Sequence, residues 1–289
     1  DYYASRGLGD VYKRQVLDHT YDFVDYVSMH QYYGNEKNDT PSFLANTMDM
    51  DRFINHIISV CDYIQAKKRS KKVLNISFDE WNVWYHAFAD NAKAEKWREK
   101  PAYNEDQYNF EDALLVGGMM ITLLKHADRV KVACMAQLVN VIAPIMTENG
   151  GRIWKQTIYY PYLHASLYGR GTALNVLVDA PKYDCKEYTD VPALESIAVE
   201  SGDGAYVTIF AMNRGEDDLE VTCCLRDYPG CRVEEFITMA GYDLKQYNTA
   251  DQPDRVIPQS SSAYEMEGDC LTVMFSSYSW NVVRVRVGK

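Results

Sequence analysis

The chain has 289 residues, of which 47% are hydrophobic and 25% charged, and its formal net charge at pH 7 is -11. This composition is typical of a globular protein, and the excess of acidic groups argues against nucleic acid or an anionic membrane surface as a partner. No stretch is long and apolar enough to span a bilayer.

The basic and cysteine residues give no sign of a binding site. The basic run at residues 67–72 is predicted to be a solvated helix end, where cations are favoured by the helix dipole. Seven cysteines, an odd number, favour a reducing compartment over a disulfide framework. Cys61 and Cys134 lie in apolar periodic segments and are predicted to be small core residues. Without a Cys-x-x-Cys motif or a histidine cluster, neither a metal site nor a cofactor is expected.

The first 15 residues are interpreted as an artefact. One reading frame of a widely used transposase sequencing adapter translates to Asp-Val-Tyr-Lys-Arg-Gln, and residues 10–15 have this sequence. Residues 1–15 are therefore set aside from the fold prediction. Because the chain also lacks an initiating methionine, we expect it to be a fragment whose N-terminal part is missing.

The segment from residue 16 to 170 alternates between strand and helix patterns. Strands are expected at residues 23–29, 73–78 and 130–137, and helices at 49–68, 110–127 and 154–168. This order predicts parallel strands with right-handed crossovers, and their apolar runs suggest burial on both faces. Gly117 and Gly118 would allow a neighbour to approach the second helix closely.

From residue 171 to 289 the helical period is lost. Short segments separated by turn residues are predicted to be strands, at residues 205–212, 218–225, 232–239, 270–275 and 279–287. These segments predict a jelly-roll-like β-sandwich domain. The expected fold is therefore an α/β domain followed by an all-β domain.

Three βα units are too few to close a domain, since they leave open sheet edges. The simplest completion is a (β/α)8 TIM barrel of which residues 16–170 supply the last three units. Catalytic residues of such barrels lie at the C-terminal strand ends. The three strands here end in polar residues, namely His30, Gln31 and Tyr32, then Glu80, and then Gln137 and Asn140.

Glu80 is the candidate catalytic carboxylate. It follows a short apolar strand and precedes Trp81 and Trp84, and a glycosidase needs a rigidly held carboxylate beside flat apolar faces that stack on a sugar ring. The alternative is a strand that ends in a turn, with both tryptophans in the core.

Three segments resemble the C-terminal half of family 51 glycoside hydrolases, the α-L-arabinofuranosidases. They are residues 28–35 (SMHQYYGN), 77–85 (SFDEWNVWY) and 136–145 (AQLVNVIAPI). The resemblance extends over residues 16–289. It implies a retaining enzyme that removes terminal non-reducing α-L-arabinofuranosyl groups from arabinan, arabinoxylan or their oligosaccharides. It also implies a cytoplasmic homo-oligomer, although a secretion signal cannot be judged from a truncated chain.

The resemblance implies roles for individual residues. Glu80 matches the nucleophile, and Tyr32 matches a tyrosine that donates a hydrogen bond to it. The expected substrate-binding residues are His30, Tyr32, Trp84, Gln137, Asn82 and Asn140, the last two in supporting roles. For His30 and Asn140, the alternative is a buried polar group that the protein itself satisfies.

The acid/base glutamate of the family lies in an Asn-Glu pair on an earlier strand, so we expect it to be absent from this chain. Glu36 and Glu105 also follow asparagine, but Glu36 lies beyond a strand end and no strand precedes Glu105. Neither is expected to be the acid/base.

Two rival functions are open. The sandwich could be a carbohydrate-binding module, but Tyr206, Phe210 and Phe236 occupy positions compatible with pointing inward. Alternatively, the barrel could belong to another retaining glycosidase, such as a β-xylosidase or an endoglucanase.

Overall fold

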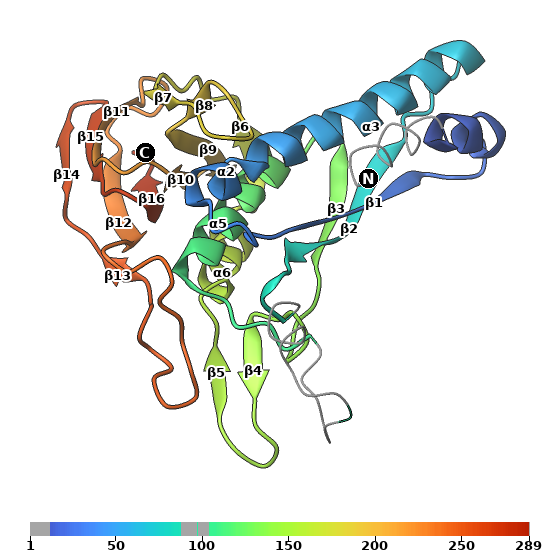
Figure 1. Cartoon of the computed structure of the whole chain (residues 1–289). Coiled ribbons are helices and arrows are strands. Elements are labelled where there is room, and N and C mark those ends of the chain that lie inside the picture. Colours follow the sequence, from blue (N-terminus) through green and yellow to red (C-terminus); the bar gives the residue numbers. More distant parts are fainter. Residues whose placement is uncertain (1–11, 88–96, 98–103, 289) are drawn as a thin grey trace.

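A computed structural model describes residues 12–87, 97 and 104–288 of the chain. Most of the segment interpreted as an artefact, residues 1–11, lies outside this range, and residues 12–20 are helical. Figure 1 shows a parallel sheet and, across a layer of helices, the two larger antiparallel sheets. Two further antiparallel sheets have two strands each. Of the helices in the described ranges, none has the length and apolar character needed to cross a membrane.

The three predicted parallel strands are present and form one sheet in the order β1-β2-β3. Their bounds are β1 Tyr26–Tyr33, β2 Asn75–Val83 and β3 Val130–Met135. The crossovers contain α2 Thr40–Leu44, α3 Asn46–Lys68 and α5 Phe110–Lys125, and α6 Tyr159–Tyr168 follows β3. The basic cluster lies at the end of α3 as expected, where Lys67, Lys68 and Lys72 pair with Asp18, Asp22 and Asp25.

Two expectations about this sheet were wrong. It is buried on one face only: residues of β1 alternate between buried and exposed, and most of β3 is exposed. Phe78 on the covered face packs on Phe53 of α3, and β2 also contacts α5, whereas many side chains of the other face are exposed in the described chain. Cys134 on β3 is therefore exposed, although Cys61 on α3 is buried as predicted.

The third predicted helix begins five residues late. Residues Ile153–Lys155 form β5, which pairs with β4 at Ile145–Thr147 in an antiparallel hairpin. This hairpin projects from the body of the molecule (Figure 1). Trp154 pairs with Met146 of β4 in this hairpin, so α6 starts only at Tyr159.

The C-terminal part is a β-sandwich, as predicted. A six-stranded sheet has the order β13-β12-β16-β10-β9-β6, and a three-stranded sheet has the order β11-β15-β14. The strands expected from sequence are β10 Tyr206–Asn213, β11 Leu219–Cys224, β12 Arg232–Met239, β15 Cys270–Phe275 and β16 Ser279–Arg286. Strands not predicted are β6 Gly171–Leu174, β7 Lys182–Tyr183, β8 Val191–Pro192, β9 Leu194–Ser201, β13 Gln259–Ser260 and β14 Tyr264–Glu267.

The two parts of the chain share one hydrophobic core. Helix α5 lies between the parallel sheet and the six-stranded sheet (Figure 1). A Cβ atom at Gly117 would lie 2.5 Å from the Trp280 ring, and one at Gly118 would lie 2.7 Å from Met212. These glycines therefore allow the close approach expected from sequence, and the approaching neighbour is the sandwich.

A buried hydrogen bond also joins α6 to the sandwich. His164 is only 5% exposed, and its Nδ1 accepts a hydrogen bond from Nε1 of Trp280 on β16 at 3.0 Å. Burial lowers the pKa of His164 to about 4. The imidazole is therefore neutral in the folded protein at pH values where an exposed histidine is already charged.

Because His164 is buried with a lowered pKa, we expect the folded protein to lose stability in acid. As the pH falls through about 6.5, His164 gains a proton in the unfolded chain but not in the folded protein, so the unfolded state binds more protons. Its contribution to stability is complete above about pH 6.5 and is lost by about pH 4, an expected decrease of about 3 kcal/mol in the free energy of unfolding. Chemical denaturation between pH 7 and pH 4 measures this decrease. His164→Asn, which keeps an acceptor but cannot titrate, should show a smaller decrease, and equal decreases would contradict the prediction.

Candidate active site

A β-bulge in β2 places two consecutive acidic residues beside the same histidine. Ser77 pairs with Ser28 and Glu80 with His30, so β2 uses three residues where β1 uses two. The register with β3 shifts at the same place, between Phe78 and Trp81. Side chains of a regular strand alternate between faces, and the extra residue interrupts this alternation. Asp79 and Glu80 therefore both reach the open face of the sheet.

Three side chains of β1 meet these carboxylates. The Tyr32 hydroxyl donates a hydrogen bond to Oε2 of Glu80 at 2.9 Å. The His30 ring lies between the two acids, with Nδ1 3.5 Å from Glu80 Oε2 and Nε2 3.6 Å from Asp79 Oδ2. Ser28 donates to Asp79 at 2.8 Å. His30 is half-exposed, so the alternative of a buried, satisfied histidine does not describe it.

The electrostatics favour a protonated Tyr32 hydroxyl and an ionised Asp79. Burial, and then the hydrogen bond to Glu80, raise the pKa of Tyr32, so its hydroxyl remains a donor at neutral pH. For Asp79, burial alone would raise the pKa, but hydrogen bonds from Ser28 and the backbone outweigh it and lower the pKa. The contact between Ser28 and Asp79 was missed from the sequence. The sequence feature that could have revealed this contact is the spacing of Ser28, His30 and Tyr32, which places all three on one face of the strand.

The two tryptophans of the Glu80 motif have different positions. Trp81 is buried and its ring stacks on Tyr162, so the alternative prediction of a core position is confirmed for Trp81. Trp84 is only partly buried, and its ring meets the Tyr32 ring edge-on with centroids 5.2 Å apart. Its backbone N–H donates to Tyr33 at 2.8 Å, which fixes it just past the end of β2.

The remaining sequence candidates follow β2 and β3. Gln137 is exposed just past β3, and the N–H of the preceding Ala136 bonds to Trp81 of β2. Asn82 is fully buried, and its amide donates to the carbonyls of Ala136 and Ile142 at 2.7 Å each. The Asn140 amide is held by Thr147. Asn82 and Asn140 therefore bind the protein's own loops, whereas Gln137 has its side chain in solvent.

The two other Asn-Glu pairs lie in loops. Glu36 is exposed three residues beyond the end of β1, and Glu105 is exposed in the connection before α5. The carboxylate that shares contacts with Glu80 is Asp79, its chain neighbour. Within the ranges described, no group of three or more His, Cys, Asp or Glu side chains is placed to hold a metal ion.

Residues 79–279 match the family described as the α-L-arabinofuranosidase C-terminal domain. The chain belongs to this family. Named relatives agree: an intracellular exo-α-(1→5)-L-arabinofuranosidase 1 of Bacillus subtilis is 49% identical over 95% of this chain and 55% of its own length. A second, from Halalkalibacterium halodurans, is 51% identical over 93% of this chain and 54% of its own length.

The solved structures support the fold assignment. A family 51 α-L-arabinofuranosidase from Bifidobacterium longum superposes with a TM-score of 0.87 at 33% identity, covering 96% of this chain and 56% of that one. The expected resemblance to the C-terminal half of family 51 enzymes is thus confirmed. The chain spans about half the length of the relatives that it matches.

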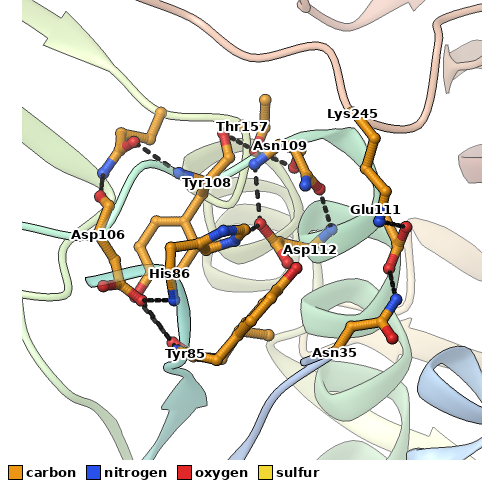
Figure 2. A network of polar contacts seen from close by, with 12 residues as sticks. Asn35, Tyr85, His86, Asp106, Tyr108, Asn109, Glu111, Asp112, Thr157 and Lys245 are labelled. Carbon is orange, nitrogen blue, oxygen red and sulfur yellow. Dashed lines mark hydrogen bonds and ion pairs between the residues drawn. The ribbon is translucent and has the colours of Figure 1, made fainter. Parts of the chain in front are cut away.

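This arabinofuranosidase-family chain also has a largely buried polar network, shown in Figure 2. Asp106 is 1% exposed and accepts the backbone N–H groups of Tyr85, His86 and Ala87 at 3.1, 3.2 and 2.7 Å. These residues directly follow Trp84. Burial raises the pKa of Asp106, although the N–H groups oppose this.

Two further buried acids complete the network. Asp112 contacts Nε2 of His86 at 2.7 Å and accepts the N–H of Asn109, which caps α5. Burial alone would lower the pKa of His86, but the charge of Asp112 outweighs it and raises the pKa. Glu111 binds Asn35 and Lys245, so it links the loop after β1 to the sandwich. This network was missed because its members come from four distant segments.

Tyr32→Phe tests the contact with Glu80. In an enzyme completed to the length of its relatives, losing this hydrogen bond is expected to lower kcat/KM for an aryl α-L-arabinofuranoside by about 10- to 100-fold. Steady-state kinetics measure the loss. Tyr26→Phe is the matched control, because Tyr26 lies on the same strand and is 49% exposed. An unchanged kcat/KM in Tyr32→Phe would show that the hydroxyl does not assist Glu80.

Proposed function

We propose that this chain is the C-terminal part of a retaining, exo-acting α-L-arabinofuranosidase in which Glu80 is the nucleophile. The observation that carries the proposal is the bulge at the end of β2, which presents Glu80 on the open sheet face with the Tyr32 hydroxyl 2.9 Å away. His30, Trp84 and Gln137 surround the same strand ends and would contact the sugar. Asn82 and Asn140 would support them by holding the loops.

The reaction would be a double displacement. The Glu80 carboxylate would attack the anomeric carbon and form an ester with the arabinofuranosyl group. The leaving oxygen would take a proton from a second carboxyl group, which would then remove a proton from the water that hydrolyses the ester. We place that acid/base on a segment outside this chain, because Glu36 and Glu105 lie in loops rather than at strand ends.

The geometry of a retaining pair supports this placement. Its two carboxyl groups must stand about 5–5.5 Å apart on either side of the bond that is cut. The open sheet face beside Glu80 leaves room for a second carboxyl group, and the relatives are about twice as long as this chain.

We therefore expect the 289-residue chain to be inactive or very weak by itself. Incubation with an aryl α-L-arabinofuranoside, followed by absorbance of the released phenol, measures this directly. Turnover that persists after exhaustive purification would contradict the placement of the acid/base outside the chain.

The substrates would be arabinofuranosyl-containing oligosaccharides or polysaccharides. Relatives named for α-(1→5) and α-(1→6) cleavage both match, so a panel of linkages is needed to separate them. We further propose a cytoplasmic enzyme, since relatives are named intracellular and all seven cysteines are free thiols. That it assembles as a homo-oligomer stays a prediction, which light scattering of the completed protein would test.

The decisive experiment is covalent trapping. A fluorinated or cyclophellitol-type arabinofuranoside reagent should label the completed enzyme once, and peptide mapping should place the label on Glu80. A label on another residue would overturn the assignment.

The rival functions have less support. Phe210 and Phe236 are buried, and Tyr206 is partly covered, so these rings do not form the exposed aromatic row of a binding module. Binding of residues 172–289 alone to arabinoxylan would reverse this judgement. A β-xylosidase or endoglucanase would be recognised by its activity in the same substrate panel.

A further inference from the structure

A second concave site lies beside the buried network. It is a cavity of about 780 Å³ formed by the loops after β1 and β2, the β4–β5 hairpin and the segment at residues 245–247 of the sandwich. We call it the outer cavity. Its volume lies within the range of small-ligand sites. Backbone hydrogen bonds from Phe110 to Gln246 and from Glu111 to Leu244 fix the sandwich segment against the start of α5.

Residues of the network described above, which Figure 2 shows, form part of the lining of the outer cavity, and we call this part its floor. Its members that line the cavity are Asn35, Tyr85, His86, Asp106, Asn109 and Lys245. Because their polar groups are already oriented by hydrogen bonds and ion pairs, a ligand would meet a preorganised surface.

The walls combine aromatic rings with hydrogen-bonding groups. Trp154 of β5 and Tyr247 are partly exposed, and Glu36, Glu105 and Gln107 are exposed at the rim. Rings of this kind pack against the apolar faces of sugars, and carboxylates and amides accept hydrogen bonds from hydroxyl groups.

The charges favour a neutral ligand. The two basic side chains of the floor each contact a buried acid, His86 with Asp112 and Lys245 with Glu111. The rim carries the carboxylates Glu36 and Glu105. An anionic ligand, such as a phosphate or a uronic acid, would therefore meet uncompensated negative charge.

We propose that the outer cavity binds the sugar residues of an arabinofuranosyl oligosaccharide that lie beyond the residue cleaved at Glu80. This inference rests on the proposed function and names its substrate as an oligosaccharide rather than a single glycoside. Asn35 and Glu36 also line a neighbouring cavity of about 500 Å³ that reaches Tyr32 and Trp84. The two cavities thus share two lining residues, and the neighbouring cavity is lined by the Tyr32 and Trp84 side chains of the Glu80 site.

Calorimetric titration of the 289-residue chain with α-1,5-linked arabinotriose tests the proposal. We expect measurable binding, weakened about tenfold or more by Trp154→Ala and severalfold by Glu105→Ala. Trp154→Phe should restore most of the affinity, because a ring is retained. Tyr264→Ala is the matched control, since Tyr264 is also an exposed aromatic residue on a strand, and it should bind like the parent chain. Circular dichroism confirms that each variant is folded.

The proposal is overturned if the parent chain does not bind arabinotriose, or if Trp154→Ala and Glu105→Ala bind it unchanged. Should Trp154→Ala prove unfolded, Glu105→Ala and Trp154→Phe decide the matter. Trapping at Glu80 is independent of these results. A correctly placed covalent label together with no effect of the cavity variants would refute only the outer cavity. A label elsewhere, together with the expected effects of the cavity variants, would refute the assignment of Glu80 and leave the outer cavity as a sugar-binding site.

Discussion

Glu80→Gln is expected to lower kcat/KM for an aryl α-L-arabinofuranoside by at least about a thousandfold in an enzyme completed to the length of its relatives. The amide has nearly the same shape but is not a competent nucleophile, so the glycosyl ester cannot form. Tyr32 can still donate to the remaining carbonyl oxygen, which limits structural change. The measurement is steady-state kinetics, supported by mass spectrometry of the trapped enzyme.

The control for this substitution is Glu265→Gln, an exposed acid on β14 far along the chain from the strand ends. It should retain full activity. An equal loss in Glu36→Gln or Glu105→Gln, with activity preserved in Glu80→Gln, would move the catalytic carboxylate to one of the two loops.

Arg214→Ala should produce the largest loss of stability. The Arg214 side chain is fully buried, and Nη1 donates to the Leu44 carbonyl at 3.0 Å and to the Thr47 hydroxyl at 2.8 Å. Nη2 pairs with Glu195, whose pKa is lowered because Arg214 and Lys125 outweigh the opposing effect of burial. Removing the guanidinium leaves these buried acceptors without their donor, at an expected cost of about 3–5 kcal/mol in the free energy of unfolding.

Urea denaturation at pH 7 measures this cost. Arg226→Ala is the matched control, because Arg226 is an exposed arginine of the same sandwich, and its effect should stay within about 0.5 kcal/mol. If Arg214→Ala unfolds at the same urea concentration as the parent chain, the buried pair does not stabilise the contact between the sandwich and the first helices.

The site residues that could be predicted from sequence are those at the ends of the parallel strands. Polar residues that follow apolar runs mark the carboxyl ends of strands, and the carboxyl ends of parallel strands lie at the same edge of the sheet. The strand-end pattern predicts that His30, Tyr32 and Glu80 lie close together, and the structure places them in contact. The fold class followed from the change of hydrophobic period near residue 170, because helices and sandwich strands bury their apolar residues at different spacings.

The features that could not be predicted from sequence arise from pairing between segments that are distant in the chain. The bulge at Asp79 and Glu80 arises from the register against two neighbouring strands, which no local pattern records. Residues Leu194–Ser201 form β9 because β10 offers it a partner along most of its length. Likewise, the exposed Cys134 follows from the sheet having one uncovered face, whereas its apolar surroundings in the sequence suggested burial.

The position of β16 in the six-stranded sheet affects how the protein is made. β16 lies between β10 and β12, both of which precede it in the sequence, and its Trp280 closes against Gly117 of α5. During translation, β10 and β12 are synthesised before β16, the strand that pairs with both of them. Likewise, α5 is synthesised before Trp280, whose ring packs against Gly117. Nascent chains should therefore remain open to proteases and dependent on chaperones until the segment at residues 279–286 emerges, and then become resistant in a single late step.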